Sequence, residues 1–195
     1  MTATTRLGAA TEAASRVLHA AADGPLADRT ELAGLEDALH WCARLDHRAD
    51  EPAALLPAVI LAALAEEAGQ ASRSDPNQIG SELRGAGVPA AVAQLIGRLS
   101  CLDCNTERPL LDADPDGAVV MDARLAVLAR PPDAYRSYLR AVSRRDTSGR
   151  RWAQVRGLLD RDAVYATPEC RVSLEGRARY NLAFESSELR EASQV

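Results

Sequence analysis

The stretch AVILAALAEEAG, residues 58–69, decides the fold, because its first eight residues are apolar and leave no polar stripe. As a helix it would have no face suited to solvent, so we predict a buried central helix. Two starts are open. Either Pro57 occupies the first helical position, or the helix begins near Pro52 and Pro57 kinks it from inside. Gly69 suits the position after the last turn. At about 12 residues the stretch is too short for a membrane span, which needs roughly 20.

Composition predicts an all-α fold. Of the 195 residues 47% are hydrophobic but only 4% are aromatic, and alanine and leucine dominate the apolar part. These are good helix formers, whereas the β-branched and aromatic residues that favour strands are scarce. We therefore expect one domain over residues 1–195, a helical bundle of about seven to nine helices with frayed tails at 1–10 and 186–195.

Charge and targeting patterns narrow the function. The net charge of −5 and the pI of about 5.3 argue against nucleic acid as a partner. No signal peptide or membrane span is recognisable, so we expect a cytoplasmic protein with no membrane partner. Its cysteines would then be reduced, small buried hydrophobes. A solvated face or loop is the expected place for the dense arginines at Arg144, Arg145, Arg150 and Arg151.

Apolar spacing and turn residues predict the remaining helices. The first follows Thr11, with one apolar face. The others are expected over 29–47, as a short helix reaching Arg84 if Asp75-Pro76 is its cap and not merely a turn, from Pro89, from Met121 to Arg130, from Asp133, over 150–162, and as one last helix from Pro168, capped by Thr167, through Phe184.

Three motifs suggest metal binding, and each has a simpler interpretation. His40 and His47 project the same way, but seven residues is wide for two ligands of one ion, and exposed histidines are favoured. Cys101 and Cys104 make only half of a zinc site, since no second CxxC or CxxH lies nearby. The acidic cluster at Asp112, Asp114 and Asp116 begins like a calcium loop, yet proline at the fourth position and the missing closing acid predict a turn.

The order of these features resembles the predicted metal-dependent phosphohydrolases of the HD superfamily, over roughly Ala22 to Glu185. The segment VMDARLAVLARPPDAYRSYLRAV (120–142) is similar to the family's Asp-x-Asp helix and the tyrosine helix after it. The family's Ile-Tyr-x-Thr and Ala-Arg-x-Asn-Leu signatures correspond here to residues 164–167 and 178–182. The resemblance implies a helical domain of the HD type, whose enzymes hold divalent cations with histidines and aspartates and activate a water molecule.

The positions that carry this chemistry in the family are altered here. Thr30 and Gly34 stand where a Tyr-His-Asn-Leu-x-His segment has its histidines. The His-Asp doublet falls on Ala62-Ala63 or on Ala65-Glu66, depending on the register. Of the Asp-x-Asp pair Asp122 persists, whereas Arg124 replaces the second aspartate. A Thr-x-x-His segment has become Leu99-Ser100-Cys101-Leu102.

This pattern of losses predicts a catalytically degenerate protein with no bound metal and no cofactor. Asp122 and Glu66 would be remnants of the ancestral site, although Asp122 suits a helix cap equally well. A vestigial cleft is expected near Gly34, Ala65, Cys101, Asp122 and Arg124.

Three functions are open. The first is a ligand-binding or protein-interaction module whose partner is a phosphorylated small molecule, a nucleotide or a protein. The chain itself could form a homo-oligomer. The second is a phosphohydrolase whose Mn, Fe or Mg ligands are rebuilt from Glu66, Glu67, Asp75 and Asp122, with His40 or His47. The third is a small interaction module that zinc at Cys101 and Cys104 stabilises.

Overall fold

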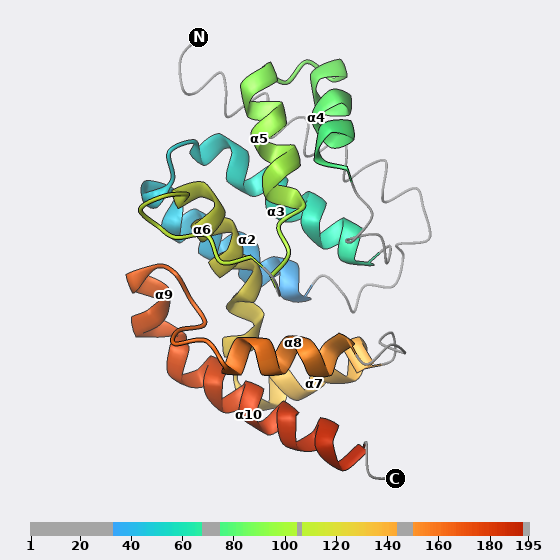
Figure 1. Cartoon of the computed structure of the whole chain (residues 1–195), viewed down its shortest axis with the longest axis vertical. Helices are drawn as coiled ribbons and strands as arrows, with labels where there is room; N and C mark the ends of the chain where they lie inside the picture. Colours follow the sequence, from blue (N-terminus) through green and yellow to red (C-terminus); the bar gives the residue numbers. More distant parts are fainter. Residues whose placement is uncertain (1–32, 68–74, 105–106, 144–149, 193–195) are drawn as a thin grey trace.

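The computed structural model describes residues 33–67, 75–104, 107–143 and 150–192, and these ranges are entirely helical apart from their connections. The expected helix after Thr11 lies outside them, as does the expected tail at 1–10. The elements are α2 (Ala33–Leu45), η1 (Asp46–Arg48), α3 (Pro52–Glu67), α4 (Pro76–Gly85), α5 (Ala90–Ser100), α6 (Pro115–Leu125), η2 (Ala126–Ala129), α7 (Pro132–Ser143), α8 (Arg150–Leu159), α9 (Pro168–Ser173) and α10 (Glu175–Ala192), where η marks a 3-10 helix. They form a single compact helical domain (Figure 1), which confirms the all-α prediction.

Helix α3 is the central helix that the apolar stretch predicts. It begins at Pro52, so the earlier of the two starts is correct and Pro57 lies inside the helix. It packs against α5, α2 and α6. Ala54, Ala58 and Ala62 lie on one side and are at most 1% exposed. Because a methyl group is small, this side allows neighbouring helices to approach closely.

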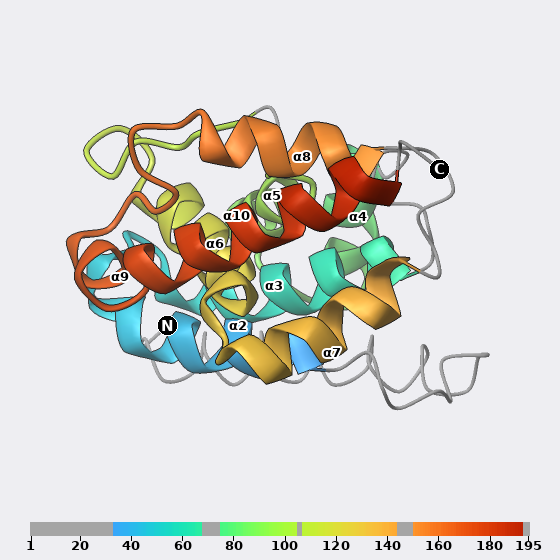
Figure 2. The same ribbon diagram turned by 90° about the horizontal axis from the view of Figure 1, so that it is seen from below.

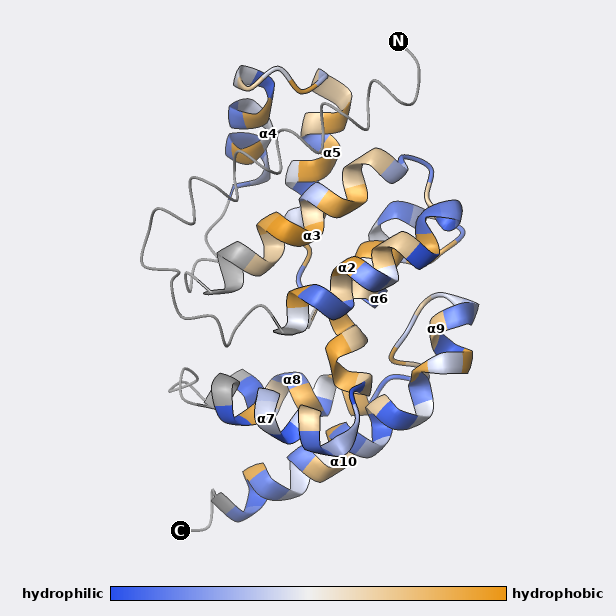
Figure 3. Cartoon of the chain, turned by 180° about the vertical axis from the view of Figure 1, so that it is seen from behind, coloured by the Kyte–Doolittle hydropathy of each residue, from blue (hydrophilic) through white to orange (hydrophobic). Residues whose placement is uncertain are grey.

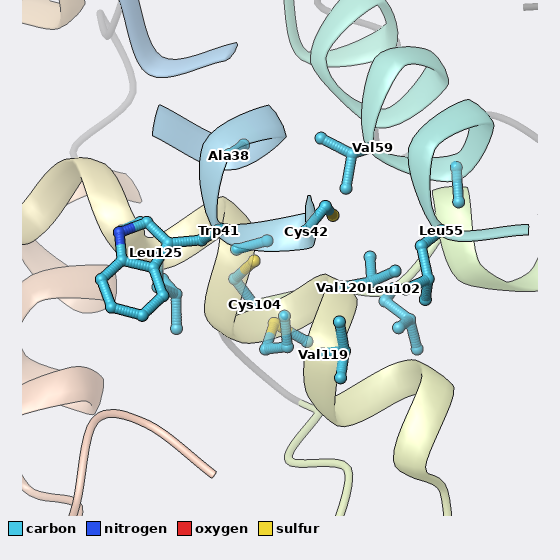
Figure 4. Close-up of a cluster of buried hydrophobic side chains, with 14 of the residues drawn as sticks. Ala38, Trp41, Cys42, Leu55, Val59, Leu102, Cys104, Val119, Val120 and Leu125 are labelled. Carbon is cyan, nitrogen blue, oxygen red and sulfur yellow. The ribbon is translucent and has the colours of Figure 1, made fainter. Parts of the chain in front are cut away.

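The main core lies between α2, α3, α6 and the segment that follows α5. Figure 4 shows these elements contributing apolar side chains that converge, among them Cys42 from α2, Val59 from α3, Val120 from α6 and Leu102 from the segment after α5. Each of these four side chains is at most 5% exposed. Burial of such side chains contributes about 1.5–3 kcal/mol each and is the main force that holds these helices together.

Helix α4 is fastened to α5 at a close backbone contact. A Cβ atom added at Gly97 of α5 would lie 2.3 Å from the carbonyl oxygen of Pro76 at the start of α4. Only glycine allows this approach. The start of α4 was predicted correctly, since the Asp75 carboxylate accepts a hydrogen bond from the Asn77 amide at 2.9 Å.

The acidic cluster forms a turn and a helix cap, as the turn interpretation predicted. The Asp114 carboxylate accepts from the Gly117 amide at 3.0 Å and so begins α6 at Pro115. The expected start at Met121 was therefore too late. Arg98 of α5 donates two hydrogen bonds to Asp114, at 2.7 and 2.9 Å. This guanidinium holds the pKa of the Asp114 carboxyl below its ordinary value.

The second half of the chain forms a layer of α7, α8 and α10, in which α10 packs against α8 and is joined to α7 by Tyr135 (Figure 2). The last helix was predicted as one piece, but it is broken at Leu174 into α9 and α10. The Leu174 amide donates to the Cys170 carbonyl at 2.7 Å at this break. Helix α10 continues to Ala192, so residues 186–192, expected as part of a frayed tail, are helical.

A buried ion pair joins the three helices of this layer. The Arg151 guanidinium of α8 donates to both carboxylate oxygens of Glu185 of α10, at 2.6 and 2.8 Å. The Tyr135 hydroxyl of α7 donates to the same carboxylate at 2.6 Å. Arg151 is 8% exposed and Glu185 is 3% exposed, so the prediction of a solvated arginine face is wrong for Arg151. Of the other three arginines, the structure describes no side chain.

We expect Glu185→Ala to lower the free energy of unfolding by about 3–5 kcal/mol, because it leaves the Arg151 guanidinium buried without its counter-charge. The measurement is urea denaturation followed by circular dichroism. Glu188→Ala, at an exposed position of the same helix, is the matched control and should change the value by less than about 0.5 kcal/mol. Equal effects of the two substitutions would contradict the stabilising role of the Arg151–Glu185 ion pair.

Candidate functional site

Asp122, the persisting acid of the expected Asp-x-Asp pair, lies inside α6 and is 1% exposed. Its Oδ1 atom accepts a hydrogen bond from the Ala166 amide at 2.8 Å. Its Oδ2 atom accepts from the Thr167 amide at 2.7 Å and from the Thr167 hydroxyl at 2.6 Å. The carboxylate therefore ties α6 to the backbone immediately before α9.

The interpretation of Asp122 as the cap of its own helix is wrong. Asp122 does not begin its own helix, which starts seven residues earlier at Pro115. It binds the residues that begin α9, where the Thr167 hydroxyl oxygen also accepts from the Cys170 amide at 3.4 Å. One carboxylate and one hydroxyl thus satisfy backbone donors that would otherwise be buried without partners.

Two opposing effects act on the proton affinity of Asp122. Burial raises its pKa above the ordinary value, while the hydrogen bonds from Thr167 and Ala166 oppose that rise. A carboxylate has about four lone-pair positions, and three of them are taken by these donors. Coordination of a divalent cation through both oxygens would therefore require at least one of these hydrogen bonds to break.

Arg124 faces away from Asp122. Two residues along a helix correspond to a rotation of about 200°, so the side chains leave α6 on opposite sides. The Arg124 guanidinium donates to the Leu102 carbonyl at 2.5 Å, in the segment after α5. Burial raises the pKa of the nearby Cys101 thiol, and the positive charge of Arg124 partly opposes that rise.

The remaining residues of the expected cleft are distributed over several places. Gly34 faces η2, since a Cβ atom added there would lie 3.8 Å from a methyl group of Val127. Cys101 ends α5, and its sulfur lies 4.0 Å from the Ser100 hydroxyl. Ala65 and Glu66 belong to α3, but their side chains are outside the described residues. Of the expected cleft, the structure brings Cys101 and Arg124 near each other and places the Asp122 carboxylate elsewhere.

The residues that were expected to rebuild a metal site lie in different places and contact different partners. Asp75 caps α4, and Asp122 binds the start of α9. His40 is exposed on α2, with its ring edge-on to Trp41. His47 is also exposed, with its Nε2 atom 3.5 Å from the Glu169 carboxylate. Exposed histidines were the prediction and are confirmed. Among the described side chains, which exclude Glu66 and Glu67, no three His, Cys, Asp or Glu residues are placed to hold a metal ion.

The two CxxC cysteines differ in burial. Leu102 and Cys104 are buried in the core, whereas Cys101 is half-buried and Asp103 is exposed (Figure 4). This alternation turns neighbouring side chains of the segment to opposite sides. Three of the four cysteines are buried small hydrophobes, as predicted, and none of the four forms a disulfide. Burial raises the pKa of the Cys42 and Cys170 thiols to about 12.

The segments that carry the HD resemblance serve the connection between α8 and α9. Glu175 accepts hydrogen bonds from the Val164 amide, at 3.0 Å to each carboxylate oxygen. Arg179 donates to the carbonyls of Arg161 and Asp162, at 2.7 and 2.8 Å. The Tyr165 hydroxyl donates to the Leu125 carbonyl at the end of α6, at 3.0 Å. Residues 161–167 are therefore held from both α6 and α10.

Asn181 has a comparable role two residues after Arg179 on α10. It is 1% exposed, and its side-chain amide donates to the carbonyls of Leu128 and Arg130, at 2.7 and 2.9 Å. These carbonyls end η2 and have no partner within that short helix. Sequence reasoning identified the segment 178–182 only through the resemblance. The signal for a structural role was a polar residue on the apolar side of a helix, beside Ala178 and Leu182.

The fold and this site define an all-helical domain in which the buried Asp122 and Asn181 side chains bind backbone groups. Searches of protein-family models, of curated proteins and of solved structures find no match for the chain. Within the described residues, no helix is long and apolar enough to cross a membrane.

Asp122→Ala should lower the free energy of unfolding by roughly 2–4 kcal/mol, because it leaves the buried amide and hydroxyl of Thr167 and the half-buried amide of Ala166 without their acceptor. Chemical denaturation of the purified variant measures this. Asp112→Ala is the matched control, since Asp112 is exposed in the turn 111–113. A loss below about 0.5 kcal/mol for Asp122→Ala would contradict the proposed tie between α6 and α9.

The stabilisation that Asp122 provides should also depend on pH. Because the folded-state pKa is raised, the folded protein binds more protons than the unfolded chain between the ordinary value of 3.8 and the raised value. Stability from this group therefore falls as pH rises through that window. The difference in unfolding free energy between the wild type and Asp122→Asn should shrink from pH 4 upward and then level off. A difference that grows over this range would show that the pKa is lowered instead.

Proposed function

We propose that this chain is a catalytically degenerate relative of the HD-superfamily phosphohydrolases, which acts as a binding module without hydrolysing its ligand. The partner would be a phosphorylated small molecule, a nucleotide or another protein. The single observation that supports this proposal most is the state of Asp122. Its carboxylate is 1% exposed and accepts three hydrogen bonds from the start of α9.

The neighbouring substitution supports the same proposal. A hydrolase of this type needs several anionic or imidazole ligands to hold its cation. At the second acidic position the chain has Arg124, whose positive charge would repel a cation, and this guanidinium binds the Leu102 carbonyl. A carboxylate used for structure, together with the replacement of the second acid by an arginine that binds a backbone carbonyl, favours a scaffold that no longer holds a catalytic metal.

The alternative, a rebuilt metal site, would require residues to leave their present hydrogen-bond partners. Asp122 and Asp75 would have to leave their present amide donors, and the start of α4 and the start of α9 would both lose a cap. Loss of a helix cap costs about 1 kcal/mol, and that cost would be added to the cost of moving the elements together. The geometry therefore favours the non-catalytic function.

The test combines metal content with turnover. Purified protein is incubated with MnCl2, passed through a desalting column and measured by plasma mass spectrometry. Hydrolysis of p-nitrophenyl phosphate and of bis-p-nitrophenyl phosphate is followed with Mn, Mg or Fe(II). We expect substoichiometric metal and no turnover above the metal-only control. Stoichiometric Mn, Fe or Mg with turnover that Glu66→Ala and Asp122→Ala both abolish would overturn the proposal.

The same samples distinguish the zinc-stabilised module. Stoichiometric zinc that is lost in Cys101→Ser, with Cys42→Ser as the matched control, would favour that function. Binding itself is measured by titrating the protein with inorganic phosphate, with AMP and with a nucleoside triphosphate in isothermal calorimetry. Binding of one of these without hydrolysis supports a small-molecule ligand, and no binding of any of them leaves a protein as the proposed partner.

A further inference from the structure

Little apolar packing holds helix α9 in place. The helix has six residues, and Cys170 is the one among them that is buried. Val172 is 88% exposed, so it contributes almost nothing to packing. Among the described helices α9 packs mainly on α10, and Figure 3 shows it at the edge of the molecule, away from the strongly apolar helix α3. Because so short a helix is unstable by itself, α9 depends on polar contacts with the rest of the fold.

The first of these contacts covers Asp122. Ala166 and Thr167, immediately before α9, donate three hydrogen bonds to its carboxylate, and the Cys170 thiol interacts with the same group. Asp122 is 1% exposed and Cys170 is fully buried. Residues 166–170 thus supply the groups that surround the carboxylate. Movement of these residues away from α6 would expose Asp122 and Cys170 together.

The second contact is an ion pair that joins α9 to η1. Arg48 donates to the Oε1 atom of Glu169 from Nε at 2.9 Å and from Nη2 at 2.5 Å. The Nε2 atom of His47 lies 3.5 Å from the same oxygen. The side chains of Arg48 and Glu169 are 40% and 30% exposed, and ion pairs exposed to this degree contribute little to stability. This contact can therefore break without unfolding the domain.

The closed position of α9 leaves one polar atom of Glu169 unsatisfied. Its Oε2 atom is buried and has no hydrogen-bond partner among the residues that the structure describes. A buried acceptor without a donor costs free energy, and water would satisfy this oxygen if α9 moved outward. This cost offsets part of what the contact with Arg48 contributes.

The chain on both sides of α9 is fixed to other elements. Before it, the Tyr165 hydroxyl donates to the Leu125 carbonyl at 3.0 Å, and the Val164 amide donates to Glu175. After it, Leu174 is buried. An opening of α9 is thereby confined to residues 166–173. Such a local opening leaves the main core and the layer of α7, α8 and α10 folded.

We propose that residues 166–173 form a lid over the Asp122 carboxylate, which the Arg48–Glu169 ion pair latches to η1 and which opens while the main core stays folded. Opening breaks the hydrogen bonds from Ala166 and Thr167 to Asp122 and leaves Tyr165 in place. The inference concerns access to Asp122, so it does not depend on whether the domain binds a phosphorylated ligand or a metal ion.

The Cys170 thiol reports on this opening. The full chain is treated with N-ethylmaleimide under native conditions, and the labelling rate of each cysteine is measured by peptide mass spectrometry. Cys42 of α2 is the internal control, because it is 2% exposed and lies in the main core. We expect Cys170 to react at least about tenfold faster than Cys42, since a local opening requires less free energy than global unfolding. Labelling of Cys170 that is no faster than that of Cys42 would overturn the lid.

Substitutions in the ion pair test the latch. Arg48→Gln and Glu169→Gln should each speed the labelling of Cys170 by about two- to fivefold, the effect of a partly exposed ion pair, and leave Cys42 unchanged. The double substitution should add little to either single one, because all three remove the same contact. Glu188→Gln, at an exposed position of α10, is the matched control and should change neither rate. The proposal is overturned if the two latch substitutions leave the Cys170 rate unchanged, or if they speed Cys42 equally.

Discussion

The hydrogen bonds from the start of α9 to the Asp122 carboxylate are the constraint on which the second half of the structure depends. Asp122 projects from α6, which packs on α2 and α3 in the main core, and it receives the amides of Ala166 and Thr167. Tyr165 binds the end of the same helix. The main core and the layer of α7, α8 and α10 are thus connected through a few buried polar contacts as well as through apolar packing. A carboxylate in this position can be catalytic only if the connection is released.

Buried polar side chains in this protein hold elements of the fold together. Arg151 and Glu185, with Tyr135, hold three helices together from inside the layer, and Arg179 and Asn181 bind carbonyls just after α8 and at the end of η2. Arg124 binds the carbonyl of Leu102. A buried ion pair need not stabilise a fold more than apolar side chains in its place would, but removal of one partner is costly. Residues that resemble catalytic residues in the sequence are therefore costly to replace for structural reasons alone.

Local features of the fold were predictable because their causes are local. The apolar run predicts α3, and the pairs Asp75-Pro76 and Thr167-Pro168 predict the starts of α4 and α9, because a cap needs only the next three residues. Partners that are distant in sequence were not predictable. Arg151 belongs to an arginine-rich stretch, and nothing in that stretch indicates Glu185. Glu175, the residue after the break at Leu174, binds the Val164 amide, and periodicity does not report such a partner. The HD ancestry, suggested by motif order, stays a proposal.

The most direct test of the account is a crystal structure of the protein soaked in MnCl2, with anomalous diffraction recorded at the manganese edge. The account predicts no anomalous peak within coordination distance of Asp122, and a carboxylate that still accepts the amides of Ala166 and Thr167 and the hydroxyl of Thr167. A manganese ion bound to the Asp122 carboxylate, with these hydrogen bonds broken and further protein ligands around the ion, would contradict it.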